Sequence, residues 1–417
     1  MISPTRIGIY TEKGAVDSWV LGVTQSTPGT RFEEFYSVWA SSEAIIAAGN
    51  YQDGSSVYHG AVVCHDAGGD SMFWARSQTL AAEFRSTHVA FDGDNVYVLG
   101  YGRPSGTYNS AYLLKYSSAG SLQWQRKIAY AGSTSNRTTG LIVHSDGYIY
   151  AAITASGSIK YGYVVKYNDS GALQWQKRLT ATDFNQITSI RTLSDGKIGV
   201  VGGIGSSVNM VTPTFVKMNT DGTIAAKYGI SDTASPSGFG LHDVAEDASG
   251  NCYFTAARTI STTNQAVIKL TSAGALSAAK QFGFGSTSSL IINDGYIYVC
   301  GTFLMRLDTA LSIIWARSTA GISSVSAFGS VLVCAGYGEI GDTGNDAIIM
   351  RLPNNGGGLG SYGYITYDGS VTPTVADITT LSVIDPTITS ETSSLTESAG
   401  DVTDAAYSNT TTKYTRS

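Results

Sequence analysis

An internal repeat constrains the fold of this chain more than any other feature of its sequence. Residues 111–125 (AYLLKYSSAGSLQWQ) match residues 162–176 (GYVVKYNDSGALQWQ) nearly residue for residue. Weaker or more distant copies begin at four further positions: Ala61, Thr214, Ala266 and Met305. Each copy is an alternating apolar run, a four-residue turn ending in or near a glycine, and a second alternating run. Because glycine takes the positive φ that such a turn needs, each copy predicts a β-hairpin.

The second run of each copy carries a tryptophan or its equivalent, at positions 19, 74, 124, 175, 226, 278 and 315, where 226 and 278 are alanine. The spacings are 55, 50, 51, 51, 52 and 37 residues. A second hairpin, most often with an Asp-Gly turn such as the turn at Gly147 or Gly196, precedes the copies, and seven of these hairpins are present. The shortest repeat has lost the loop between its second and third strands, because residues 298–302 run almost directly into residues 303–307.

Two hairpins per repeat give four antiparallel strands, which at a period of about 50 residues is typical of a β-propeller blade. One blade cannot bury both of its faces, so neighbouring blades must stack around an axis. The sequence therefore predicts an all-β fold, a seven-bladed β-propeller of four-stranded antiparallel blades, with eight blades left open. Residues 7–10 and 18–21 look like outer strands, and we expect them to close the ring on residues 347–351. Whether residues 362–367 add a strand also stays open.

The repeated pattern resembles a known group of propellers. It reads apolar-apolar-Lys-Tyr/Leu-x-x-x-Gly-x-Leu-x-Trp and, after a gap, Asp-Gly-x-Ile-Tyr-Val-x-Gly. This resembles the seven-bladed β-propeller repeats of the SBBP, delta-60 and PQQ-like type, over about residues 7–369. The resemblance implies the fold and not a function, because such propellers serve many roles. It does not imply the PQQ-like enzyme activity, since no vicinal Cys pair and no metal-ligand constellation is recognisable.

The composition changes at residue 370, which divides the chain into a β-propeller, residues 1–369, and an acidic C-terminal arm, residues 370–417. The arm has 21 Ser or Thr among 48 residues, no Trp or Phe, and six acidic residues against two basic ones. It is too polar to fold alone, so we expect it to be disordered or extended. We expect it to become ordered on a neighbouring subunit, with a flexible tail as the alternative. Four apolar residues would anchor it by strand addition: Leu381, Val383, Ile384 and Ile388.

Charge and hydropathy exclude several partners. The net charge is −6, from 26 basic and 32 acidic residues, and no basic run is interleaved with aromatic residues, so we expect no nucleic-acid partner. No apolar run of 18 residues occurs, so we expect no membrane partner. The first six residues lack the layout of a signal peptide, and we expect a protein made in a cytoplasm and not exported by the usual route.

Cysteine and histidine offer little chemistry. No CxxC motif occurs, and each cysteine sits in an apolar run, so we expect free buried thiols at Cys64, Cys252, Cys300 and Cys334. The histidines have no metal-binding spacing, and we expect surface or loop positions for His59, His65, His88, His144 and His242. The Asp-Gly turns offer most often one carboxylate each, too few oxygens for calcium, and are interpreted as turn chemistry.

No catalytic signature is present either. A GxSxG motif followed by a helix is missing, and the glycine-rich residues 354–360 lack the Lys-Ser/Thr and the helix of a phosphate loop. A glycan-degrading propeller needs two carboxylates roughly 5–10 Å apart, which the sequence alone does not pair. We therefore predict no cofactor, no metal site and no catalytic residue, and expect that the chain is not an enzyme.

Aromatic residues suggest a recognition surface. The repeated Trp sits on an outer strand, which favours packing between blades over a sugar platform, and Trp39 lies outside that pattern. Tyrosine offers contact area and a hydroxyl group at low entropy cost. The tyrosines expected in interblade loops are therefore the candidate recognition residues, unless they are only structural: Tyr51, Tyr58, Tyr101, Tyr108 and Tyr161.

The whole profile favours a structural or interaction protein. Few charges, abundant Gly, Ser, Thr and Tyr, and an acidic arm are similar to bacteriophage virion proteins, so we expect a tail or external component that assembles through its arm. Its partners would be other virion proteins or copies of itself, and its location the virion. The alternative is a propeller that binds a carbohydrate or host receptor, such as a host surface glycan, through its interblade loops. If the arm assembles the protein, deleting residues 370–417 should leave a folded, soluble propeller that fails to assemble.

Overall fold

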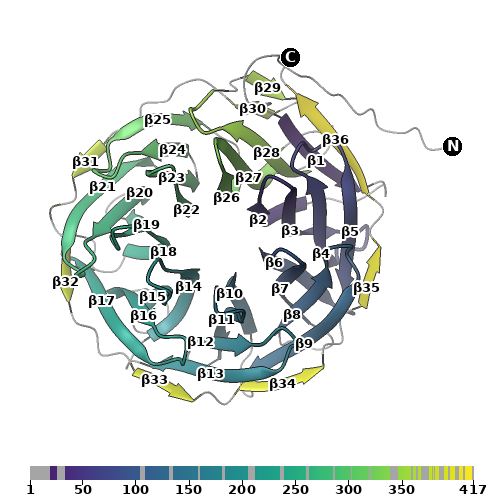
Figure 1. Cartoon of the computed structure of the whole chain (residues 1–417), viewed down its shortest axis with the longest axis horizontal. Coiled ribbons are helices and arrows are strands. Elements are labelled where there is room, and N and C mark those ends of the chain that lie inside the picture. Colours follow the sequence, from purple (N-terminus) through teal and green to yellow (C-terminus); the bar gives the residue numbers. More distant parts are fainter. Residues whose placement is uncertain are drawn as a thin grey trace.

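The protein folds into a ring of blades (Figure 1). The computed structural model describes residues 19–25, 33–103, 109–130, 135–157, 160–180, 184–204, 212–234, 239–259, 263–284, 287–301, 303–318, 321–338, 346–357, 360–362, 365–367, 375–377, 379, 381–384, 389–392, 395–399, 403–406 and 409–415. In these residues the regular elements are β-strands, and seven four-stranded antiparallel blades surround a central axis. The predicted all-β, seven-bladed propeller is confirmed, and the ring does not have eight blades. Over the same residues, no helix is long and apolar enough to cross a membrane.

Each blade runs outward from the axis through four strands. The innermost strands are β2 (Glu33–Ala40), β6 (Glu83–Phe91), β10 (Ser135–Val143), β14 (Phe184–Thr192), β18 (Phe239–Glu246), β22 (Thr287–Asn293) and β26 (Ile322–Phe328). The second strands are β3 (Ala44–Gln52), β7 (Asn95–Arg103), β11 (Ile149–Ser156), β15 (Ile198–Ile204), β19 (Cys252–Thr259), β23 (Tyr296–Gly301) and β27 (Val331–Gly338). Blades 1 to 7 are numbered by these strands in chain order.

The outer half of each blade completes the sheet. The third strands are β4 (Tyr58–Asp66), β8 (Ser110–Ser117), β12 (Lys160–Tyr167), β16 (Thr212–Met218), β20 (Thr263–Leu270), β24 (Phe303–Leu307) and β28 (Asp346–Pro353). The fourth strands, from blade 1 to blade 7, are β5 (Met72–Thr79), β9 (Leu122–Tyr130), β13 (Leu173–Thr180), β17 (Ile224–Asp232), β21 (Leu276–Phe284), β25 (Ile313–Ser318) and β1 (Trp19–Gln25). We call the end of the ring where the innermost strands begin the loop face, and the opposite end, with its Asp-Gly turns, the turn face.

The two ends of the chain meet in blade 7. Strand β1 pairs antiparallel with β28, with Val20 opposite Met350 and Val23 opposite Ala347. This confirms the predicted closure on residues 347–351, which leaves no open edge between the first and last repeats. Residues 7–10 of the expected outer hairpin lie outside the described residues. Strands β29 (Gly360–Tyr362) and β30 (Ile365–Tyr367) pair only with each other, so they form a separate two-stranded sheet.

The C-terminal arm adds a fifth strand to six blades. Figure 1 shows its strands along the outer rim, and they follow the ring in the order opposite to that of the blades. The pairs are β31 (Val375–Asp377) with β21, β32 (Leu381–Ile384) with β17, β33 (Thr389–Thr392) with β13, β34 (Leu395–Ala399) with β9, β35 (Thr403–Ala406) with β5, and β36 (Asn409–Thr415) with β1. Among the described residues, β25 of blade 6 has no such partner. The ladders have three to seven register pairs.

The anchor residues expected in the arm therefore pair within their own chain. Leu381 lies opposite Asp232 and Ile384 opposite Gly229, with Val383 between them in the same strand. Ile388 lies outside the described residues. The mode of attachment is the strand addition that the sequence suggested, but here the acceptor is a blade of the same chain. Attachment to a neighbouring subunit stays a prediction.

The repeated tryptophan fastens four of the blades to the next one. Trp74 of blade 1 donates its indole N–H to the carbonyl of Ser118 in the third turn of blade 2, at 2.8 Å. Its ring lies directly over Gly120, where an added Cβ would be 2.6 Å from the indole. Gly120 also has a φ of 77°, which favours glycine. The same N–H to carbonyl bond is made by Trp124, Trp175 and Trp315 at 3.0 to 3.1 Å. The packing interpretation of the repeated Trp is confirmed.

The two alanine repeats solve the same packing problem differently. In blade 4, which has Ala226, the ring of Tyr228 lies where a Cβ on Gly274 would be, 1.9 Å away. In blade 5, which has Ala278, the turn of blade 6 carries Leu311 in place of the glycine, at a φ of 63°. Leu311 is fully buried in the same apolar cluster as Ala278. The space left by the missing tryptophan is thus filled by a tyrosine of the same strand in blade 4, and by a leucine of the next blade in blade 5.

The cysteines and Asp-Gly turns behave as the sequence predicted, but not all histidines do. All four cysteines are free and buried. In the Asp-Gly turn of blade 4, Asp195 Oδ1 accepts the backbone N–H of Lys197 at 3.0 Å, which is turn chemistry. The surface or loop expectation is wrong for His65, which lies in strand β4 and is 1 % exposed, whereas His144 lies in the loop after β10, although it is only 4 % exposed. Burial between the blades lowers the pKa of His65 to about 4.

Candidate functional site

The innermost strands share one irregularity that shapes the axis of the ring. Each of them has a β-bulge at the equivalent place, where one extra residue interrupts its register with the second strand. The extra residues are Tyr36, Thr87, Thr139, Thr188, His242, Ser288 and Ser323. A bulge bends its strand and turns side chains in a new direction. Seven equivalent bulges therefore redirect one short stretch of each innermost strand around the axis.

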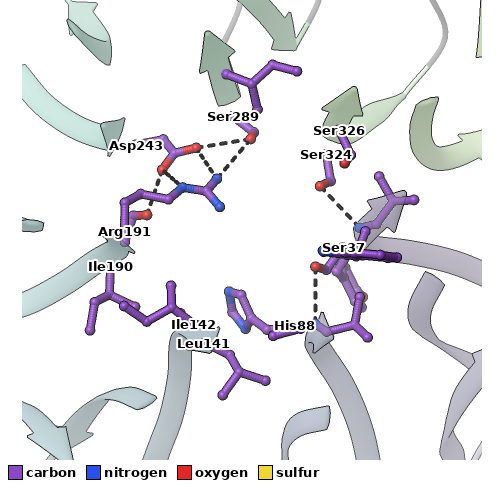
Figure 2. Close-up of a pocket in the computed structure, with 18 of the residues that line it drawn as sticks. Ser37, His88, Leu141, Ile142, Ile190, Arg191, Asp243, Ser289, Ser324 and Ser326 are labelled. Carbon is purple, nitrogen blue, oxygen red and sulfur yellow. Dashed lines mark hydrogen bonds and ion pairs between the residues drawn. The ribbon is translucent and has the colours of Figure 1, made fainter. Parts of the chain in front are cut away.

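The residues that follow the bulges form a ring around a cavity, which we call the axial ring. Its members are Ser37, His88, Gly140, Ser189, Asp243, Ser289 and Ser324. All of them line an axial cavity of about 300 Å³ (Figure 2). Six are polar and the seventh is glycine, although the residue that follows each of them in the chain is Val, Leu or Ile. The axis is thus a polar cavity inside an apolar ring of blades.

Axial-ring side chains also join neighbouring blades. Ser324 Oγ of blade 7 accepts the backbone N–H of Val38 in blade 1 at 3.2 Å, and Ser37 Oγ accepts that of Val89 in blade 2 at the same distance. Asp243 Oδ2 of blade 5 accepts the N–H of Leu290 in blade 6 at 3.1 Å. The contact is the same at three interfaces. Buried amide groups that would otherwise lack a partner are satisfied in this way.

Asp243 is the most heavily bonded group of the cavity. Arg191 donates Nε–H to Oδ1 at 2.9 Å and Nη2–H to Oδ2 at 2.5 Å, and the hydroxyl groups of Ser189 and Ser289 donate at 2.6 and 3.0 Å. Figure 2 shows this cluster on one wall of the cavity. Burial favours the neutral acid, but the charge of Arg191 and the hydrogen bonds outweigh it and lower the pKa of Asp243. The carboxylate is therefore ionised at pH 7, and the charge of Arg191 compensates its negative charge.

His88 projects into the cavity opposite this cluster (Figure 2). Burial, followed by the charge of Arg191, lowers its pKa to about 4. At neutral pH the ring is therefore uncharged and offers one nitrogen as donor and the other as acceptor. Its Nδ1 lies 2.9 Å from the hydroxyl oxygen of Thr87. The other nitrogen has no hydrogen-bond partner among the described residues, so it is available to a ligand.

At the turn face, two aromatic residues line the cavity. Trp39 and Phe91, near the ends of β2 and β6, have ring centroids 4.7 Å apart. Trp39, which does not belong to the repeated tryptophans, thus contributes to the axis and not to the seam between outer strands.

The cavity continues toward the loop face in a second chamber of about 690 Å³, which we call the mouth pocket. The two chambers share His88, Thr139, Thr188 and His242 in their linings. Strand register brings Ser135, Ser156 and Lys160 together at the loop-face edge of blade 3, and puts Arg137 opposite Thr154 two residues further inward. Blade 4 adds Gln186 beside Thr188. Apart from Ile187, the residues that line the mouth pocket carry hydroxyl, amide, imidazole or cationic groups, with no carboxylate among the described residues.

Two of the predicted tyrosines lie together on the loop face. Tyr58 stacks under Arg85, whose guanidinium carbon is 3.7 Å from the ring centroid, and Tyr101 lies opposite Arg85 in the β6–β7 ladder. The Arg85 side chain is also hydrogen-bonded to Tyr36, a residue of the axial-cavity lining. We call Tyr36, Tyr58, Arg85 and Tyr101 the rim cluster. It extends from the axis toward the edge of blades 1 and 2.

The other predicted tyrosines lie elsewhere. Tyr51 is 7 % exposed, and its hydroxyl group is 2.9 Å from Ser77 Oγ, so it belongs to the core rather than to a hydrated surface. Tyr161 is half-buried beside Lys160, with Arg178 4.9 Å from its ring centroid. Tyr108 lies outside the described residues. Sequence reasoning thus found part of the rim and missed the axial ring, because each of its members stands alone in its own repeat.

The geometry suits reversible binding of a polar molecule. No group of three or more metal-ligating side chains occurs among the described residues. The carboxylate of the axial cavity, Asp243, is already saturated by Arg191 and the neighbouring hydroxyl groups. The cavity offers a ligand hydrogen-bond donors and acceptors along its walls, with positive charge at the mouth.

Comparison with known proteins supports the fold. No known family model matches the sequence, and no curated protein is detectably similar to it. Among solved structures, a puromycin hydrolase S511A mutant is similar over 77 % of this chain and 52 % of its own, with 12 % identity and a TM-score of 0.52. A periplasmic gluconolactonase from Pseudomonas aeruginosa is similar over 87 % and 99 %, with 12 % identity and a TM-score of 0.45. A Trypanosoma rangeli sialidase is similar over 79 % of this chain and 59 % of its own, with 9 % identity and a TM-score of 0.43.

These similarities correct one expectation. The sequence analysis expected a chain that is not an enzyme, but the structures that share its fold include enzymes, with the puromycin hydrolase at a TM-score of 0.52. The expectation rested on missing linear motifs. In a ring of repeats, an active site is assembled from single residues of several blades, so a missing linear motif is no ground for excluding one. At 12 % identity the likeness to the puromycin hydrolase shows the fold alone.

Proposed function

We propose that this chain is a ligand-binding propeller that recognises a carbohydrate at the mouth pocket on its loop face. The observation that carries the proposal is the polar, solvent-connected axial cavity that seven equivalent bulges create. Sugars are bound through many hydroxyl groups, and the mouth pocket presents hydroxyl, amide and imidazole groups within one chamber. A polar ring would be costly in the core of a propeller unless water or a ligand fills the space.

The rim cluster supports the same proposal. Aromatic rings provide the flat apolar surface against which a sugar ring packs, and the hydroxyl group of tyrosine adds a polar contact. Tyr36 belongs to both the rim cluster and the axial-cavity lining. A bound oligosaccharide can therefore extend from the mouth pocket across blade 1 toward Tyr58.

Carbohydrate binding is tested first with a glycan array and then with substitutions in the site. For a glycan that binds, we expect Gln186→Ala to weaken binding about 5- to 10-fold, because one hydrogen bond between neutral groups contributes about 1 kcal/mol. Tyr58→Ala should weaken it by a similar factor. The affinities are measured by isothermal titration calorimetry.

The matched control is Gln174→Ala. Gln174 is exposed on the outer strand β13 and bonds only to the nearby carbonyl of Ala172. Its replacement should leave the affinity unchanged. An array without any binding glycan contradicts the proposal, and so does a bound glycan whose affinity neither Gln186→Ala nor Tyr58→Ala changes.

The expected role in a virus particle stays a prediction, as do its virion partners and location. The arm strands pair with blades of their own chain, and this changes the result we expect from deleting residues 370–417. Deletion uncovers the edges of six outer strands, and open strand edges promote association. We therefore expect the truncated chain to form larger, heterogeneous species, whereas the full chain gives one defined mass in light scattering. A defined oligomer of the full chain and a soluble truncated monomer would instead indicate an arm that assembles copies.

A further inference from the structure

The cations of the mouth pocket differ from those in the body of the ring. In the third strands of blades 2, 3 and 4, the lysines pair with carboxylates, which are Asp169 for Lys115, Asp146 for Lys166 and Glu246 for Lys217. Arg137 and Lys160 of the mouth pocket form no ion pair with any residue the structure describes. Both come from blade 3, where the register places them two rungs apart, so that their side chains leave the same face of the sheet.

The rest of the pocket does not neutralise them. The mouth-pocket lining holds no carboxylate among the described residues, and the carboxylate deeper in the axial cavity, Asp243, is already paired with Arg191. Two cations beside a concave wall with no counter-charge make a positive potential, which the low-dielectric walls focus into the cavity. An anion placed there gains charge-assisted hydrogen bonds, which are stronger than those between neutral groups.

The opposite side of the pocket offers only neutral groups. Gln186 and Thr188 of blade 4 and the uncharged ring of His88 provide donors and acceptors suited to hydroxyl groups. Thr139, which belongs to both chambers, has a buried hydroxyl oxygen with no hydrogen-bond partner. A buried hydroxyl group without a partner is costly, and a ligand that reaches it removes that cost.

We infer that the ligand of the mouth pocket is an acidic saccharide, whose anionic group is held by Arg137 and Lys160 while its hydroxyl groups bond to blade 4 and the axial ring. This inference rests on the proposed function, since it names the class of sugar that the same pocket takes. The recognised group is a carboxylate or a sulfate, because both accept hydrogen bonds from a guanidinium and an ammonium group.

The test uses the full chain and a glycan array with carboxylated, sulfated and neutral members. We expect the binding glycans to be acidic, and the carboxylated and sulfated sets tell which anion is preferred. Arg137→Gln and Lys160→Gln should each weaken binding of an acidic glycan about 10- to 100-fold, and Arg137→Lys should keep part of it. Raising the salt concentration from about 0.05 to about 0.5 M should weaken binding by the wild type more than binding by a chain that carries both Arg137→Gln and Lys160→Gln.

The matched control is Lys197→Gln. Lys197 follows the Asp-Gly turn of blade 4 on the turn face and pairs with Asp195, so its loss removes one charge without touching the mouth pocket. The failures of the two proposals are distinguishable. Binding of neutral glycans alone, or of acidic glycans unaffected by Arg137→Gln and Lys160→Gln, overturns the acidic-saccharide inference and leaves carbohydrate binding standing. If no glycan binds, both proposals fall.

Discussion

Replacing Asp243 with alanine is expected to lower the free energy of unfolding by about 3–5 kcal/mol, since the remaining partners lose a buried counter-charge. The Asp243 side chain is 2 % exposed and joins its own blade 5 to both neighbouring blades. Its partners are Ser189 and Arg191 of blade 4 and Ser289 and Leu290 of blade 6. Without the carboxylate, two hydroxyl groups and the buried amides of Val244 and Leu290 lose an acceptor, and Arg191 keeps a charge without a partner. The measurement is urea unfolding followed by tryptophan fluorescence.

The matched variant is Asp243→Asn, which keeps the shape and one acceptor oxygen but removes the charge. Asp243→Asn should lower the free energy of unfolding by less than Asp243→Ala does. The pKa of Asp243 is lower in the folded chain than the ordinary 3.8, so its contribution is complete above that pH and is lost as the pH falls below it. The difference between wild type and Asp243→Asn should therefore shrink on acidification. A loss below about 1 kcal/mol for Asp243→Ala would mean that the axis does not hold the ring together.

The architecture of the ring was accessible from sequence because it depends on periodicity. The hairpin turns need glycine at a positive φ, and the alternation of apolar residues marks the strands, so the repeats and their number can be counted. The closing strand β1 was predictable for the same reason, since a chain that starts in mid-repeat must complete a blade elsewhere. Trp74 and its equivalents were interpretable because they recur at the period of the repeat.

The axial ring was not accessible in this way. A β-bulge shifts the alternation by one residue, and no residue type marks the shift, as Tyr36, Thr139 and His242 show. The members of the ring are about 50 residues apart in the chain and share only polarity or small size. Asp243 and Arg191 meet across two repeats, and neither belongs to a linear motif. His88 was expected in a loop or on the surface for the same reason.

The arm shows a different limit. Its composition indicated an extended segment, and its apolar residues indicated strand addition, but the acceptor could not be predicted. Strand addition uses backbone hydrogen bonds, which are the same for any open edge, so the sequence of β32 does not distinguish its own β17 from the edge of another copy. Only the arrangement of the open edges around a closed ring determines which one the arm reaches first.

Removing the Trp74 side chain is expected to cost about 3–5 kcal/mol of folding free energy, the usual range for a buried large aromatic residue. Trp74 is 7 % exposed, packs on Gly120 and donates its N–H to Ser118. The chain itself suggests how the lost side chain can be compensated, because Ala278 faces a turn that carries Leu311 at the position equivalent to Gly120.

In the wild type, Gly120→Leu should lower the free energy of unfolding by about 3 kcal/mol or more, because the new Cβ meets the indole and the φ of residue 120 is positive. After Trp74→Ala, the same substitution should fill the cavity and regain about 1 kcal/mol.

Gly147→Leu separates the cost of backbone strain from that of the clash. Gly147 has a φ of 80°, and nothing lies within 4 Å of an added Cβ, so only strain of about 1–2 kcal/mol is expected there. Urea unfolding gives the free energy of unfolding of five chains. These are the wild type, Trp74→Ala, Gly120→Leu, the chain with both substitutions, and the Gly147→Leu control. The argument requires Gly120→Leu to change sign between the two backgrounds. If it destabilises the Trp74→Ala chain as much as the wild type, the tryptophan and the turn glycine do not share one space, and the Ala278 and Leu311 pair needs another explanation.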